Sequence, residues 1–143
     1  METTSSAAGD EGAVIDRFYA ALTAGDIEAA RACCAAEALF WHCFDGVAQD
    51  LATASQGWAA LKAAFAELAA ADVRRARTDA GSYVQRHLFM GRKPSGELVG
   101  WPVCLMVEVR NGLIWRIDEY IDRAGALAFS STEAATPGLA PLA

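Results

Sequence analysis

The chain has 143 residues, of which 54% are hydrophobic and 21% are charged, and its formal net charge is -6. A chain of this size and composition is expected to close one hydrophobic core. The acidic balance argues against nucleic acid or an anionic membrane surface as the main partner. A small neutral or apolar molecule is the partner that this composition favours.

Membrane and metal-binding segments are not evident in the sequence. No run has the length and hydropathy of a signal peptide or of a membrane span, so we expect a cytoplasmic protein that binds no membrane. The cysteines have neither metal-ligand nor redox spacing and are predicted to be small buried apolar residues in a reducing compartment; they are Cys33, Cys34, Cys43 and Cys104. We therefore expect no metal and no cofactor.

Two segments flank the predicted domain. Residues 1–11 and 130–143 are rich in small and polar residues and have no periodic apolar positions. Such segments bury too little surface to offset the entropy of ordering them, so flexible tails are expected. This leaves a single domain over residues 12–129.

Helices come first along this domain. Apolar residues at helical spacing predict a helix from Val14 to Leu22, which Gly25 ends. Asp26 is a suitable N-cap for a second helix that runs through Cys34. A short strand at 39–44 and a loop at 45–56 follow. One side of the third helix is expected to carry Trp58, Leu61, Phe65 and Leu68.

Strands fill the second half. Runs at 73–78, 83–90, 98–110 and 113–122 are joined by short turns, the last at Asn111-Gly112, and short connections imply antiparallel neighbours. Pro102 predicts a bulge or an edge position, and a bulge helps a sheet to curve. Helices followed by such a sheet indicate an α+β fold: a cone-shaped, curved antiparallel sheet with three helices on its concave face.

One carboxylate interrupts an apolar strand face. Alternate residues of a strand share a face, and Glu119 is the lone charge on a face otherwise made of Leu113, Trp115, Ile117 and Ile121. A carboxyl group in this place must find a partner or keep its proton near neutral pH. This condition is common among catalytic acids and bases. Asp118 lies on the other face, although a one-residue bulge would exchange the two acids.

Two more strands carry a single polar group on an apolar face. Arg86 shares its face with Val84, Leu88 and Met90, and His42 lies between Phe40 and Phe44. If the sheet curls so that these faces line one cavity, Glu119, Arg86 and His42 converge there, bordered by Tyr19 of the first helix. The predicted substrate-binding residues are Phe40, Trp41, Phe65, Leu88, Met90, Trp101, Val103, Ile117 and Ile121.

The opposite sheet face is expected to be exposed. It would carry Tyr83, Phe89 and Tyr120, which suggests a homodimer. His87 is expected to point outward or into that interface. The basic group Arg74, Arg75 and Arg77 is interpreted as a solvated strand face.

The element order and the final strand resemble the nuclear transport factor 2-like superfamily. Helix, helix, strand, loop, helix and long antiparallel strands, ending in Glu119-Tyr120-Ile121-Asp122, resemble its cone-shaped fold over residues 12–129. The group includes ketosteroid isomerases, polyketide cyclases of the SnoaL type, scytalone dehydratase and limonene epoxide hydrolase. One scaffold of this kind hosts many chemistries, so the resemblance speaks to fold more than to reaction.

Two branches of this group imply roles for individual residues. Glu119 stands where limonene epoxide hydrolase has a catalytic aspartate, and Arg86 matches the arginine of its Arg-x-Asp motif, whose aspartate is replaced by Leu88. His42 falls near the general base of ketosteroid isomerases, and Tyr19 is a loose counterpart of their substrate-binding tyrosine. By resemblance, Glu119 or His42 moves a proton while Tyr19 or Arg86 polarises a substrate oxygen.

Three hypotheses follow. The leading one is a cofactor-independent acid/base enzyme, of the isomerase, cyclase or dehydratase type, that acts on a small hydrophobic oxygenated metabolite such as a steroid, polyketide or terpenoid. The second is a non-catalytic module that binds a small molecule or a protein segment, in which Glu119 and Arg86 form only a structural ion pair. The third is an epoxide hydrolase with rearranged acids.

Overall fold

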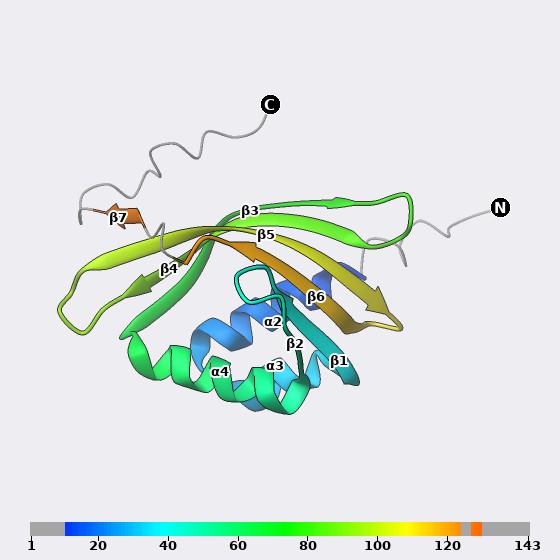
Figure 1. Cartoon of the computed structure of the whole chain (residues 1–143), viewed down its shortest axis with the longest axis horizontal. Helices are drawn as coiled ribbons and strands as arrows, with labels where there is room; N and C mark the ends of the chain where they lie inside the picture. The colour runs from blue at the N-terminus through cyan, green and yellow to red at the C-terminus, as the bar shows by residue number, and fades with distance from the viewer. Residues whose placement is uncertain (1–10, 124–126, 130–143) are drawn as a thin grey trace.

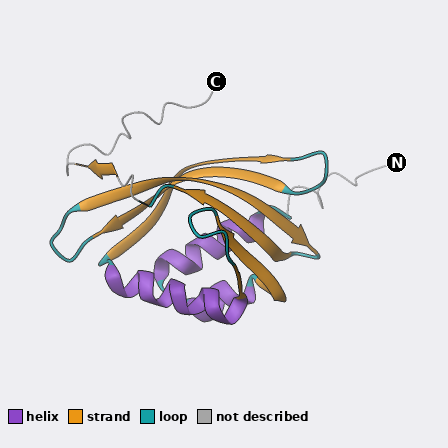
Figure 2. Cartoon of the chain, in the orientation of Figure 1, coloured by secondary structure: helices purple, strands orange, loops and turns teal. Residues whose placement is uncertain are grey.

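Three helices lie beneath the concave side of one curved sheet, as Figures 1 and 2 show. The computed structural model describes residues 11–123 and 127–129. Its helices are α2 (Ala13–Ala24), α3 (Ile27–Ala32) and α4 (Leu51–Ala64). Its strands are β1 (Cys34–His42), β2 (Ala48–Asp50), β3 (Glu67–Arg77), β4 (Tyr83–Arg92), β5 (Leu98–Arg110), β6 (Leu113–Ile121) and β7 (Leu127–Phe129). The predicted α+β fold is confirmed.

The first two helices meet at the predicted boundary. Gly25 adopts φ 78°, and its N–H donates to the carbonyl of Leu22 at 3.1 Å. The side chain of Asp26 then accepts from the N–H of Ala29 at 3.1 Å. A left-handed glycine followed by an acidic N-cap satisfies backbone groups that a helix end leaves open.

Other boundaries differ from the prediction because sheet pairing overrides helical propensity. The second helix stops at Ala32, since the Cys33 carbonyl accepts from the N–H of Ile114 at 2.9 Å and Cys34 pairs with Ile114. The third helix stops at Ala64, and Leu68 belongs to β3, where it pairs with Gly91. The expected loop at 45–56 contains β2 and the start of α4 instead.

The sheet has the order β2-β1-β6-β5-β4-β3, with β7 paired to β5. The hairpin neighbours are antiparallel as predicted, but β1 pairs with β6 in parallel. A parallel pair needs a long connection, and β2, α4 and three strands separate β1 from β6 along the chain. This unpredicted pairing brings His42 directly opposite Glu119.

The register decides which residues face the helices. Core residues Val103, Leu105 and Val107 pair with inward-facing residues of β4 and β6. A bulge at Trp115 turns the side chain of Ile114 into the core. The sequence analysis considered a bulge that would exchange Asp118 and Glu119, but the bulge lies earlier in β6 and leaves these two residues on their predicted faces. Beyond the bulge the concave face carries Ile117, Glu119 and Ile121, as predicted. On β4 it carries Tyr83, Gln85, His87 and Phe89, the set expected to point outward.

A close approach links α4 to the sheet. The Phe65 ring lies over Gly91, where an added Cβ would come within 2.6 Å of a ring carbon. The same ring meets Trp101 edge-on, with centroids 5.7 Å apart. Any side chain at position 91 would displace Phe65 from this packing.

Some sequence predictions fall at or beyond the limits of the structure. Both predicted tails lie outside the described residues, apart from Glu11, and β7 was not predicted. The prediction of buried cysteines holds for Cys34 but is wrong for Cys43, which follows the end of β1, and for Cys104, which lies on the outer face of β5. Among the described helices, no segment has the length and hydropathy to cross a bilayer.

Candidate functional site

Glu119 lies on the concave face near the C-terminal end of β6. It pairs with the fully buried Leu105 on one side and with His42 on the other. Burial raises the pKa of its carboxyl group to about 7, against a smaller lowering by the charge of Arg123. Its side chain still keeps 24% of its exposure, so a ligand can reach it. The sequence prediction of an acid that holds its proton near neutral pH agrees with this environment.

His42 stands beside this carboxyl group. Its Nε2 lies 3.7 Å from Oε1 of Glu119, and its Nδ1 is buried with no hydrogen-bond partner among the described residues. Burial lowers the pKa of the imidazole, partly opposed by Asp45 and reinforced by Arg123. At neutral pH a neutral imidazole therefore faces a carboxyl group that is close to half-protonated. Such a pair is suited to passing a proton rather than to holding a fixed ion pair.

The site opens to solvent where β1 and β6 end, and this opening is called the mouth below. An open groove of about 750 Å³ is lined by Phe44, Ile121, Asp122 and Arg123. The Phe44 ring stacks on His42 at 5.0 Å, and the Arg123 guanidinium lies over Phe44 at 4.5 Å. The groove therefore adjoins the His42–Glu119 pair.

Tyr19 reaches the same side of the sheet from α2. It is 8% exposed, and both burial and the charge of Glu119 hold its pKa well above the usual range. Its hydroxyl therefore stays protonated at neutral pH and keeps a hydrogen that it can donate to a ligand oxygen. Its ring also meets the His87 ring edge-on, with centroids 4.7 Å apart.

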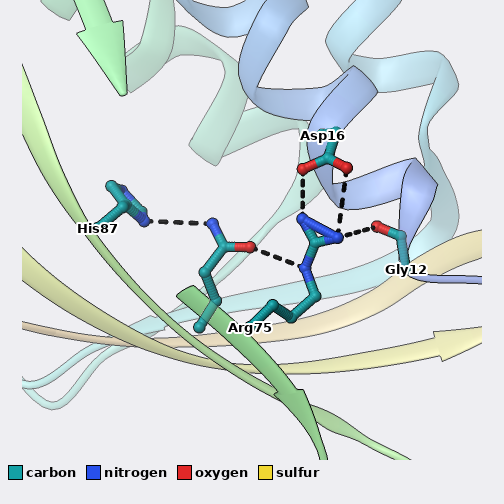
Figure 3. Close-up of polar contacts among 5 residues, drawn as sticks. Gly12, Asp16, Arg75 and His87 are labelled. Atoms are coloured by element: carbon teal, nitrogen blue, oxygen red, sulfur yellow. Dashed lines mark hydrogen bonds and ion pairs between the residues drawn. The ribbon is translucent and has the colours of Figure 1, made fainter. Parts of the chain in front are cut away.

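The sequence analysis missed a polar network that runs from the buried His87 and Gln85 through Arg75 to the exposed Asp16 (Figure 3). The Nε of Arg75 donates to Oε1 of Gln85 at 3.0 Å, and Nε2 of Gln85 lies 3.2 Å from Nδ1 of His87. Arg75 also binds the carbonyl of Gly12 at 3.0 Å and both carboxylate oxygens of Asp16. Arg75 was interpreted as solvated. The sequence did contain one indication of this network: Gln85 and His87 are two residues apart, so both polar side chains lie on the same face of the strand.

Arg86 does not lie in the predicted site. It pairs with Cys104, whose neighbour on β6 is Tyr120, so it points to the outer face of the sheet. There its Nη2 donates to Oδ2 of Asp72 at 3.1 Å, beside a pocket of about 250 Å³. Arg86 therefore does not meet Glu119, and the predicted pair of these residues is wrong, whether catalytic or structural. The two faces of β4 were too similar in hydrophobicity for the pattern to choose between them.

The predicted lining residues divide between the two faces. Those on the concave side or packed against its core are Phe40, Phe65, Trp101, Val103, Ile117 and Ile121. Trp41, Leu88 and Met90 lie on the outer side, because they pair with Asp118, Pro102 and Gly100. Tyr83 and Phe89, expected to be exposed, are buried in the core, and of that group Tyr120 alone is exposed, at 46%.

Aromatic rings fill much of the space where an enclosed cavity was expected. The Trp58 ring meets those of Phe18 and Phe40 edge-on, each at 5.1 Å. Two pockets are prominent in the described part of the chain, and they lie at the mouth and on the outer face rather than between helices and sheet. Access to Glu119 is therefore from the mouth.

The SnoaL-like domain family matches residues 15–117, which is most of the chain. The chain belongs to the SnoaL-like domain family. The predicted membership of the nuclear transport factor 2-like superfamily is thereby confirmed. No curated protein matches the SnoaL-like chain in sequence.

Solved structures share the fold of this SnoaL-like protein. A provisionally assigned polyketide cyclase from Xanthomonas campestris is 18% identical, with 82% of this chain and 93% of that chain covered and a TM-score of 0.70. IdmH from Streptomyces antibioticus, also provisionally named a polyketide cyclase, is 21% identical, with 80% and 93% covered and a TM-score of 0.70. A Catenulispora acidiphila protein with a ketosteroid isomerase-like fold is 15% identical, with 75% and 83% covered and a TM-score of 0.64.

Taken together, the SnoaL-like chain presents one acid and several neutral donors on its concave face. Glu119 can take or give a proton near pH 7, while Tyr19 can donate to a ligand oxygen. Among the described residues, no group of His, Cys, Asp and Glu side chains could hold a metal ion.

Proposed function

We propose that this SnoaL-like protein is an acid/base enzyme that needs no cofactor and moves a proton on a small hydrophobic oxygenated molecule. Glu119 is the proton carrier, His42 exchanges the proton with it, and Tyr19 contacts a substrate oxygen. Isomerisation, cyclisation and dehydration all begin with such a transfer.

The single observation that carries the proposal is the environment of Glu119. Its carboxyl group is reachable from the mouth, has a pKa near 7, and has no cation within ion-pair distance among the described residues other than His42 when protonated. A general acid or base works best when its pKa lies near the operating pH. The names of the structural neighbours, polyketide cyclases and a ketosteroid isomerase-like protein, are consistent with this chemistry.

The epoxide hydrolase hypothesis is disfavoured by the corrected faces. The resemblance to limonene epoxide hydrolase required an arginine and a second acid on the earlier strand. The inward-facing residues near the middle of β4 are Gln85 and His87 instead, and Arg86 points away. The binding-module hypothesis is the second candidate, because the open groove lined by Phe44, Ile121, Asp122 and Arg123 could hold a ligand without any chemical step.

Exchange of α-protons separates an enzyme from a binding module. The protein is incubated in D₂O with 1-tetralone, a bicyclic ketone, and loss of the α-proton signal is followed by NMR. Exchange above the buffer rate is expected for the natural protein and not for Glu119→Gln. The matched control is Asp118→Asn, which removes the same charge from the other face of the same strand. Equal rates for Glu119→Gln and the natural protein would refute the proposal.

The homodimer remains a proposal. Large apolar residues that are exposed on strands include Tyr120 and Met106, both on the outer face of the sheet. Measurement of molar mass by light scattering tests this proposal, and a monomeric mass at micromolar concentration would contradict it.

A further inference from the structure

Arg123 stands at the mouth with a charge that no nearby carboxylate balances. Its guanidinium lines the open groove and lies over the Phe44 ring, 4.5 Å from the ring centroid. Among the described residues, none of the ion pairs includes Arg123. A guanidinium in the wall of a groove that lacks such a partner is suited to receive an anionic group from a ligand.

Arg110 shows the same stacking with the charge balanced. Its guanidinium lies over the Trp115 ring at 4.9 Å, at the opposite end of β6 from the mouth. There its Nη2 also donates to Oε2 of Glu108 at 3.1 Å. The two arginines thus share an aromatic ring beneath the guanidinium and differ in the acceptor beside it. In the described part of the chain, Arg123 lacks the carboxylate that Arg110 has.

Stacking leaves the useful edge of the Arg123 side chain available. The contact with Phe44 occupies a flat face of the guanidinium, whereas its N–H groups point outward in the plane. A carboxylate is also planar and accepts parallel N–H···O bonds from that edge. Because the ring restricts the orientation of the guanidinium, less side-chain entropy is lost when a carboxylate binds. The edge of Arg123 is therefore a preorganised carboxylate site.

This edge is close to the groups that are proposed to move the proton. The Phe44 ring that carries Arg123 also stacks on His42 at 5.0 Å, and Nε2 of His42 lies 3.7 Å from Oε1 of Glu119. The charge of Arg123 reaches both groups, since it lowers the pKa of His42 and that of Glu119. One small molecule can therefore contact Arg123 and Glu119 together.

The other charged groups of the mouth restrict the ligand to one negative charge. Asp122 lines the groove, and Asp45 lies close enough to raise the pKa of His42, although one oxygen of Asp45 accepts from a backbone N–H of its own turn. These acids repel an anion of higher charge, such as a phosphate monoester. Arg123 repels an ammonium group from the Phe44 ring. A carboxylate satisfies both conditions.

We infer that Arg123 binds a carboxylate group of the molecule that occupies the mouth, and that Phe44 is the positioning residue for its guanidinium. The substrate of the site is then a hydrophobic oxygenated acid. Net charge favoured a neutral partner because it averages over the whole chain, whereas the groove places one cation beside the proton pair. This inference rests on the proposed function, because it narrows the substrate class of that site.

The groove has room for such a molecule. Its volume of about 750 Å³ lies within the range of small-molecule sites. Phe44 and Ile121 give apolar contacts for a ring system, Arg123 receives the carboxylate, and Glu119 lies where the groove adjoins the proton pair. A bicyclic ketone with a carboxylate on the ring that does not carry the carbonyl has this arrangement of groups.

Three ligands of one shape test the inference. They are 1-tetralone-6-carboxylate, the corresponding carboxamide, which lacks the charge, and 6-(aminomethyl)-1-tetralone, which reverses it. Their affinities are measured by NMR titration of the ¹⁵N-labelled protein. We expect the carboxylate to bind about 3- to 10-fold more tightly than the carboxamide, and the ammonium compound to bind most weakly. The preference should shrink as the salt concentration rises.

Variants assign the preference to Arg123. In Arg123→Gln the affinities for carboxylate and carboxamide should become equal, and Arg123→Lys, which keeps the charge without the planar edge, should retain part of the preference. The matched control is Arg110→Gln, which removes a stacked guanidinium from the other end of β6 and should leave the preference unchanged. Phe44→Leu should reduce the ratio of the two affinities, and Phe44→Tyr should restore it. A general loss of packing would not change this ratio.

Several outcomes would overturn the inference. They are equal affinities for carboxylate and carboxamide in the natural protein, tighter binding of the ammonium compound, and an undiminished preference in Arg123→Gln. Failure of the carboxylate to bind at millimolar concentration would overturn it as well.

The inference and the proposed function fail separately. A carboxylate preference that depends on Arg123, without exchange of α-protons in any of the three ketones, would keep the ligand class and refute the acid/base enzyme. Exchange that depends on Glu119, with equal affinities for carboxylate and carboxamide, would keep the enzyme and refute the role of Arg123.

Discussion

The two faces of strand β4 treat neighbouring polar residues in opposite ways. On the outer face, Arg86 keeps 21% of its exposure and pairs with Asp72. On the concave face, His87 is neutral and buried, held by Gln85. A charge survives where water and a counter-ion remain, whereas burial under helices selects neutral donors and an acid that keeps its proton. The comparison supports placing the proposed proton chemistry on the concave face.

The largest expected difference between the two faces is the effect of a substitution on the rate of proton transfer. Glu119→Gln is expected to slow exchange by about 10²- to 10⁴-fold, because it removes a general base. In the natural protein the rate should rise with pH through an apparent pKa of about 7, as the carboxylate forms. Rates measured by NMR between pH 5.5 and 8.5 test both points. Arg86→Met on the outer face is the control, and a comparable loss there would contradict the assignment of the two faces.

The second effect is on the pH dependence of stability. The pKa of Glu119 is raised to about 7 in the fold, so the folded state binds the extra proton and this stability is lost as the pH rises through 7. Glu119→Gln lacks this loss. Relative to the natural protein it should gain on the order of 2 kcal/mol in the free energy of unfolding between pH 5 and 8.

His87 contributes with the opposite sign. Its folded pKa of about 4 lies below the ordinary value of 6.5, so its stability is present above pH 6.5 and is lost as the pH falls toward 4. The two contributions offset each other between about pH 4.5 and 6.5 in the natural protein. Urea unfolding of the natural protein and of Glu119→Gln between pH 5 and 8 measures the difference in their free energies of unfolding. If the two free energies depend on pH in the same way, the pKa of Glu119 is not raised in the fold.

The third effect concerns packing on the concave side. Gly91→Ala is expected to destabilise the fold by about 1–3 kcal/mol, because the new Cβ would meet the Phe65 ring. Gly57→Ala is the control: the residue lies in α4 with open space around it, and alanine there should stabilise by about 0.5–1 kcal/mol. Thermal unfolding compares them, and equal effects would mean that Phe65 does not pack on Gly91.

The smallest effect is on the outer face. Arg86→Met is expected to cost about 1 kcal/mol or less, because the pair with Asp72 is partly exposed and screened. Measurement at low and high salt sharpens the point, since the cost should shrink as salt rises. A cost of several kcal/mol that does not depend on salt would place Arg86 in a buried role instead.

Periodicity was sufficient for the elements and for the central acid. The helical stripe, the left-handed Gly25 and the Asn111-Gly112 turn are local signals, and each element that they predicted is present. Glu119 stood out because every other member of its strand face is apolar. Local signals gave wrong boundaries where pairing between distant segments determined the secondary structure. Cys33 and Cys34 were predicted to be helical, but they bond and pair with Ile114 of β6 instead.

Chain order and side-chain chemistry thus determined the α+β class, the three helices and an acid with a perturbed environment, because these depend on residues close together in sequence. Tertiary structure alone decided that Arg86 faces outward, that His42 meets Glu119 across a parallel pair, and that Arg75 orients His87 through Gln85. The reason is register: shifting an alternating strand by one residue exchanges its faces, and only the partner strand fixes that shift.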